Sequence, residues 1–202
     1  MLQEAYIRSV EPLIAACRQP AGSASSAGLN STMLFHLLSG GHTEVIRACR
    51  THPDLQAAIS RLDQESRIDL LSAQAPDGSH ALAQMLRAGH WATLREYAML
   101  LRAHADDRRV LQEILGRSDL PGLLNEIVLL GHAPAVPALG EFWALLGLTR
   151  RELLPLLTVP HAASAQTIMQ VAQHAPGNAA ARKAIAVLGQ FGLLEARVFV
   201  TR

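Results

Sequence analysis

The stretch "PDGSHALAQMLRAGH" (Pro76–His90) opens with a turn, continues as an apolar helical pattern and stops at a Gly-His pair. The same pair ends "LFHLLSGGH" at His42 and "NEIVLLGH" at His132, so successive pairs lie 48 and then 42 residues apart. A related pair, Gln173-His174, follows after a further 42 residues. Self-similarity with a period of about 20 to 50 residues is typical of chains that repeat one supersecondary unit. We therefore expect a structural repeat rather than a set of catalytic histidines.

Alignment on these pairs places apolar residues at the same positions of successive units. The shared positions are Leu34, Leu82 and Leu124; Leu37, Met85, Ile127 and Met169; and Leu38, Leu86 and Val128. Each unit reads as a turn, a short helix, Gly-His, a second helix and one more short amphipathic helix. In the fourth unit Gln166 and Gln170 replace apolar residues, as a terminal unit requires because its outer face meets water.

The predicted organisation is one all-α domain of about four units preceded by a capping segment. The units are expected at approximately 28–75, 76–119, 120–161 and 162–202, with an N-terminal capping helix and linker at 1–27.

Half of the residues are hydrophobic but only 4% are aromatic. This composition favours close packing of helices over a β-sandwich, which is rich in β-branched and aromatic residues.

Charge and motifs argue against several classes of function. The net charge of +1 gives no basic surface for nucleic acid, and no phosphate-binding loop or metal-spaced cysteine cluster is present. No apolar run reaches the roughly 18 residues that a membrane-spanning helix needs. Two cysteines, Cys17 and Cys49, are too few for a disulfide framework. We therefore expect no cofactor, no metal, no nucleic acid and no membrane as ligands.

The stretch "DGSHALAQMLRAGH" resembles the first half of an ankyrin repeat. The matching positions are Asp77, Gly78, Leu82, Gly89 and His90, whereas His80, Ala81 and Ala83 replace the usual Thr, Pro and His. In the first unit Thr32, Leu34, Gly41 and His42 match, and "GHTEVIRAC" is similar to the usual continuation. Ankyrin units run to about 33 residues, and the surplus here fits the extra helix. The resemblance implies a solenoid of about four divergent, elongated ankyrin-like repeats.

This elongated pattern, over roughly residues 28–195, is similar to the ankyrin-like domains of bacterial type III secreted effectors, most of all the arginine ADP-riboxanase group. In that group a separate N-terminal domain uses NAD to modify an arginine of host caspases, assisted by calmodulin, and the ankyrin-like domain recruits the caspase. The resemblance implies a non-catalytic recruitment module that is secreted into the host cytoplasm. It also implies that the chemistry and the secretion signal belong to a catalytic domain outside this chain.

Repeats of this kind present a concave face made of equivalent positions from successive units. One predicted row is His36, Gln84, Glu126 and Ile168, and the next is Ser39, Arg87, Leu129 and Val171. The turn residue Asp77 and the aromatic Trp91 complete the predicted partner-binding surface, because an exposed Trp can anchor a partner. Trp143, in a dense apolar run, is predicted to lie in the core.

Two alternatives remain open at this level. Cys49 follows His42 by seven residues, so a Cys/His hydrolase site is conceivable, although Cys49 lies in an apolar stripe where a free Cys usually acts as a small hydrophobe. The other alternative is a structural spacer, or an intramolecular clamp, without a host partner. One equivalent histidine per unit cannot form a zinc site, because packed helices lie 8–10 Å apart and zinc needs ligands at about 2 Å.

Overall fold

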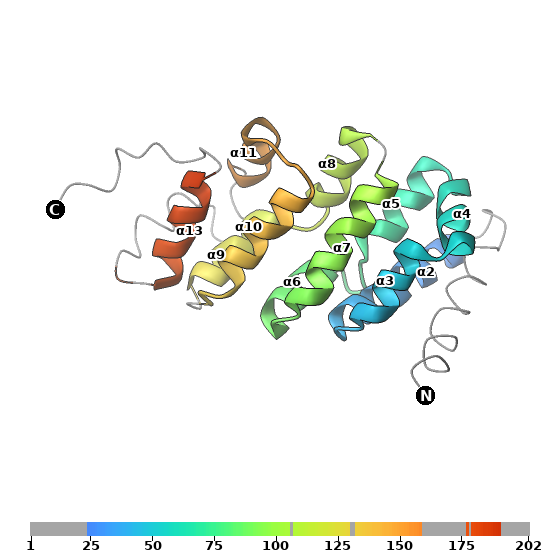
Figure 1. Cartoon of the computed structure of the whole chain (residues 1–202), viewed down its shortest axis with the longest axis horizontal. Helices are drawn as coiled ribbons and strands as arrows, with labels where there is room; N and C mark the ends of the chain where they lie inside the picture. Colours follow the sequence, from blue (N-terminus) through green and yellow to red (C-terminus); the bar gives the residue numbers. More distant parts are fainter. Residues whose placement is uncertain (1–23, 106, 130–131, 159–176, 178, 191–202) are drawn as a thin grey trace. The chain divides into compact units, whose positions relative to one another are not determined.

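The computed structural model describes residues 24–105, 107–129, 132–158, 177 and 179–190. Within these residues the chain is helical and contains no β-strand (Figure 1). The predicted all-α class is therefore confirmed. Most of the predicted capping segment and most of the fourth predicted repeat lie outside the described residues. So do the candidate residues Ile168 and Val171.

The chain divides into two compact units, Met1–Ser118 and Asp119–Arg202. In the first unit the helices are α2 (Ala24–Ser39), α3 (Thr43–Thr51), α4 (Pro53–Arg61), α5 (Gln64–Ser72), α6 (Ala81–Ala88), α7 (Trp91–His104) and α8 (Arg108–Gly116). In the second they are α9 (Leu120–Leu129), α10 (Ala135–Leu145), α11 (Arg150–Thr158) and α13 (Ala179–Gln190).

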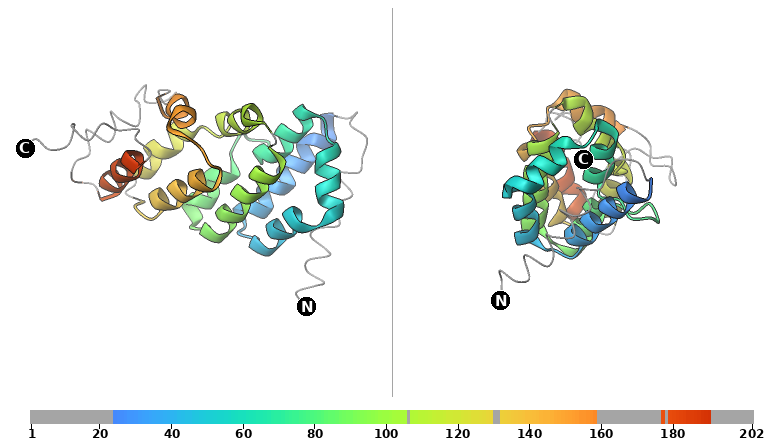
Figure 2. Two further views of the ribbon diagram at one scale, coloured as in Figure 1. Left: turned by 45° about the horizontal axis from the view of Figure 1, so that its top comes forward. Right: turned by 90° about the vertical axis from the view of Figure 1, so that its right-hand side faces the viewer.

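In the first compact unit, helices at equivalent positions of the predicted repeats pack side by side. Helix α2 packs against α6, α3 against α7, and α5 against both α2 and α8 (Figure 2). In the second unit α9 contacts α10, α11 and α13. Helices α2 and α6 are the first helices of the first two predicted repeats, and α3 and α7 are the second helices. Equivalent helices of these two repeats, both within the first compact unit, are therefore neighbours.

The Gly-His junctions share one backbone geometry. Gly41 and Gly89 have φ of 73° and 74°, a left-handed conformation that ends a helix and that glycine adopts without the strain of a Cβ atom. The following residues, His42 and His90, also agree, with φ/ψ of −77°/63° and −81°/60°. Each histidine N–H donates to the carbonyl five residues earlier, at 3.0 and 2.9 Å, and His132 donates likewise at 3.0 Å. The same backbone hydrogen bond of a histidine therefore follows the ends of α2, α6 and α9.

The core contains the apolar residues that the alignment places at equivalent positions. Leu34, Leu82 and Leu124 are buried, as are Leu38, Leu86, Met85 and Ile127. Leu37, the counterpart of Met85 in the first unit, is only half-buried. Trp143 is 1% exposed, which confirms its predicted place in the core.

The extra segment that follows α3 in the first predicted repeat holds two helices, α4 and α5, where the sequence indicated one. Leu62 is extended, and the Asp63 carboxylate then accepts a hydrogen bond from the Ser66 N–H at 2.9 Å, which starts α5. A helix cap of this kind satisfies one of the four N–H groups that a new helix leaves without a partner. The chain therefore turns at Leu62 instead of continuing α4.

Candidate protein-binding surface

The predicted rows begin on the neighbouring helices α2 and α6. His36 and Arg87 are exposed, and Ser39 and Gln84 are partly exposed. On both helices the buried residues occupy the opposite positions, such as Leu34 and Leu38 on α2. Because α2 and α6 pack side by side, the structure brings these four predicted residues to neighbouring helices of one compact unit.

The remaining predicted residues have more varied positions. Asp77 is exposed in the turn before α6, and Trp91 is half-buried at the start of α7. Glu126 is partly exposed on α9, in the second unit, and the side chain of Leu129 on the same helix lies outside the described residues. Ile168 and Val171, named above as outside the described range, complete the predicted set.

Asp77 is engaged in its own turn. Its carboxylate accepts a hydrogen bond from the backbone N–H of Ser79 at 2.9 Å and another from the Ser79 hydroxyl. These bonds, the one from the hydroxyl first, hold the pKa of Asp77 below its ordinary value. Gly78 follows with φ of 85°, which allows the tight turn. Asp77 therefore shapes the loop that precedes α6, in addition to being exposed there.

The electrostatics of the α2 and α6 face are simple. Neither helix contains an acidic residue, and the fixed charge on the two helices is Arg87. Gly40 and Ala88, both exposed, lie beside the rows and add no side chain larger than a methyl group. A surface of this kind can form hydrogen bonds and close backbone contacts with a protein, and it offers no general acid or base other than histidine.

The imidazole of His90 packs against the preceding Gly-His turn. Neither His42 nor His90 caps the helix that follows it with its side chain. A Cβ atom on Gly41 would lie 2.8 Å from Nδ1 of His90, so the His90 ring lies directly against the preceding Gly-His turn. Residue 41 therefore needs glycine for two reasons, its left-handed backbone and the space that the His90 ring occupies.

The structure also bears on the metal and hydrolase interpretations. Across the described residues, no three His, Cys, Asp or Glu side chains come together in a group that could hold a metal ion. Cys49 is 1% exposed on the inner side of α3, where Ile46 and Ala48 are also buried. Its thiol is therefore shielded from any substrate in solution. Cys17, the other cysteine, lies outside the described residues.

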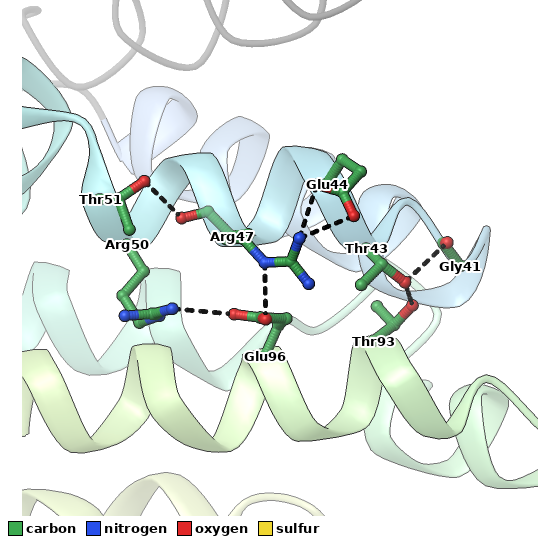
Figure 3. Close-up of polar contacts among 8 residues, drawn as sticks. All are labelled: Gly41, Thr43, Glu44, Arg47, Arg50, Thr51, Thr93 and Glu96. Atoms are coloured by element: carbon green, nitrogen blue, oxygen red, sulfur yellow. Dashed lines mark hydrogen bonds and ion pairs between the residues drawn. The ribbon is translucent and has the colours of Figure 1, made fainter.

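An ion-pair network around the buried Glu96, which the sequence reasoning missed, joins α3 to α7 (Figure 3). The Glu96 carboxylate, with 7% of its side chain exposed, accepts hydrogen bonds from Nε of Arg47 at 2.8 Å and from Nη2 of Arg50 at 3.2 Å. Arg47 also bonds Glu44 at 2.8 Å, and the carboxylates, Glu96 first, raise its pKa. A hydrogen bond of 2.7 Å between Thr43 and Thr93 continues the contact.

The sequence did contain a sign of this network. Glu96 is a charged residue among the buried positions of α7, next to Leu94, Tyr97 and Ala98. A buried carboxylate needs charged or hydrogen-bonding partners, and α3 supplies two arginines three residues apart. Because both arginines neutralise Glu96, the cluster holds the helix pairs together and provides no free nucleophile or base.

No helix in the described part of the chain is both long enough and apolar enough to cross a membrane. Comparison of the chain with protein families, with characterised proteins and with solved structures gave no significant match.

Proposed function

We propose that this chain is a non-catalytic protein-binding module built of divergent ankyrin-like repeats that form a solenoid. The observation that carries the proposal is the pair of neighbouring helices α2 and α6, which carry exposed or partly exposed polar residues at equivalent positions. A preformed helical face of this kind loses little conformational freedom when a partner binds.

In the more specific form of the proposal, the partner is a host protein, with a caspase as the first candidate. The chain would then act inside the host cell as the recruitment module of a secreted bacterial virulence effector. A separate NAD-dependent ADP-riboxanase domain would modify the recruited protein. This form rests on the resemblance of the Gly-His units to that effector group.

The test is calorimetric titration of this chain with purified host caspases. We expect a Kd of about 1 µM or tighter for one of them, as is usual for specific interfaces of moderate size. The variant His36→Glu, Arg87→Glu places two acids on the proposed face and should weaken binding while the circular dichroism spectrum stays unchanged. A matched control is Arg61→Glu, an exposed charge reversal on α4 of the same compact unit.

Equal affinity for the double variant and the wild type would exclude this face. Failure of every caspase to bind would remove the effector assignment, and the spacer or intramolecular-clamp alternative would then be favoured. The hydrolase alternative requires an accessible cysteine, and the burial of Cys49 leaves only Cys17 for that role.

A further inference from the structure

Helix α11, in the second compact unit, exposes a face that combines cations with apolar side chains. Arg150, Arg151, Leu154 and Pro155 are all exposed, and they lie on one side of the helix at spacings of one and four residues. Leu153 on the other side is fully buried, and α11 packs on α9. Among the described residues, Leu154 is the large hydrophobic side chain that stands out to solvent, at 38% exposure.

The stability of α11 does not explain these residues. Arg150 and Arg151 occupy the first turn, where the positive end of the helix dipole disfavours cations. Within the described structure neither guanidinium forms a hydrogen bond or an ion pair. Pro155 lies inside the helix, where it cannot donate to the carbonyl of Arg151. Local conflicts of this kind concentrate at functional sites.

Helix α8 offers an internal comparison. Its residues Arg108 and Arg109 precede Arg150 and Arg151 by 42 residues, which is also the spacing between His90 and His132. The next outward positions in α8 are polar, Gln112 and Glu113, and Glu113 forms an ion pair with Arg117 at 3.2 Å.

At the corresponding positions α11 has Leu154 and Pro155. The inward leucine is kept in both helices, with Leu111 and Leu153 buried, whereas the buried Val110 of α8 corresponds to the partly exposed Glu152 of α11. At two exposed positions α11 therefore carries apolar side chains where α8 carries polar ones, which is a change expected of a contact surface.

We propose that this α11 face docks an acidic segment of a protein partner, with an apolar side chain of that segment lying on Leu154 and Pro155. Carboxylates on either side of the apolar residue would pair with Arg150 and Arg151, whose planar guanidinium groups suit bidentate binding. The inference rests on the proposed function, because it supplies a second contact for the same kind of partner, and it states the chemistry of that contact.

Charge and size select this occupant over two others. Stable attachment to an anionic membrane needs a broader apolar face and more cations than two arginines and one leucine. Single-stranded nucleic acid needs aromatic platforms beside the cations, and none of the four residues of the face is aromatic. An acidic peptide with one apolar anchor matches both components of the α11 face.

The experiment uses a short fluorescein-labelled peptide in which aspartates flank a leucine, titrated with the full chain and followed by anisotropy. We expect a Kd of about 100 µM, as for a small peptide contact. Arg151→Glu and Leu154→Gln should each weaken binding by about fivefold or more. Leu154→Gln installs the residue that α8 carries at the equivalent position, so it should leave the fold unchanged.

Arg109→Glu is the matched control, because it reverses the equivalent exposed charge on α8 and should leave the peptide affinity unchanged. Equal losses in Arg109→Glu and Arg151→Glu would overturn the proposal, since they would indicate non-specific charge attraction. Absence of peptide binding, or binding to phosphatidylserine vesicles instead, would overturn it as well.

The outcomes also separate this inference from the proposed function. Caspase binding that depends on His36 and Arg87, without any effect of Arg151 on the peptide, would refute the α11 inference and leave the proposed function standing. Peptide binding that depends on Arg151, without binding of any caspase, would support the α11 site and refute the caspase assignment.

Discussion

Removing the two arginines that neutralise Glu96 should destabilise the first unit more than removing Glu96 itself. Glu96 accepts hydrogen bonds from Arg47 and Arg50, and 7% of its side chain is exposed, whereas the arginine side chains are 46% and 28% exposed. If Glu96 is lost, both guanidinium groups can turn to water. If both arginines are lost, an ionised carboxylate stays buried without partners, which is the costlier state.

The magnitude follows from the same geometry. A hydrogen bond to a charged group contributes about 1.5–3 kcal/mol net. Glu96→Gln keeps the size of the side chain and one acceptor oxygen, and the freed arginines regain hydration. We therefore expect Glu96→Gln to lower the free energy of unfolding by about 1–2 kcal/mol. The double variant Arg47→Gln, Arg50→Gln should lose more, and adding Glu96→Gln to it should restore part of the stability.

The assay needs a probe that reports on the first unit alone, because the chain forms two compact units. Cys49 on α3 is such a probe, since its thiol is buried in the folded protein. Urea titrations of a Cys17→Ser background, with pulses of thiol-specific label, would give the free energy of opening around α3. Far-ultraviolet circular dichroism would follow the whole chain.

The decisive comparison is the sign of the change when Glu96→Gln is added to the double arginine variant. A triple variant that is less stable than the double variant would refute the reasoning, because it would mean that the unpaired carboxylate is not penalised. A Glu96→Gln variant as stable as the wild type would show that the network contributes nothing net.

Three further predictions follow from the turns and the core. Gly89→Ala should lower the free energy of unfolding by about 1–2 kcal/mol, because alanine is strained in the left-handed backbone conformation. Gly41→Ala should lower it more, because its Cβ would also meet the imidazole of His90 in the next Gly-His turn. Thermal unfolding of the two variants compares them. Cys49 in the native Cys17→Ser chain should react with iodoacetamide far more slowly than in urea; rapid native alkylation would instead revive the hydrolase alternative. Hydrogen bonds from the backbone N–H and then the hydroxyl of Ser66 lower the pKa of Asp63. The contribution of this helix cap to stability should therefore be complete above the ordinary Asp pKa range and vanish as the pH falls through the lowered pKa. An Asp63→Ala variant whose stability has the same pH dependence as the wild type would contradict this.

The repeated helical motif was predictable from local chemistry. Gly-His pairs at regular spacing and leucines at helical spacing indicated helix ends and buried faces, and Gly41, Gly89 and Leu82 occupy those places. These features depend on backbone conformation and on apolar periodicity, which neighbouring residues determine. The half-exposure of Trp91 and the burial of Trp143 follow from the same patterns.

Other features depended on residues far apart in the sequence. Glu96 meets Arg47 and Arg50 only because α3 and α7 pack together, so no local window reveals the pairing. The exposed face of α11 likewise becomes visible only when the burial of Leu153 fixes which side of the helix meets solvent. The sequence by itself determined where the helices before the Gly-His pairs end, since that chemistry is local. The tertiary structure decided which charges are neutralised and which remain available to a partner, because burial and pairing are properties of the packed helices.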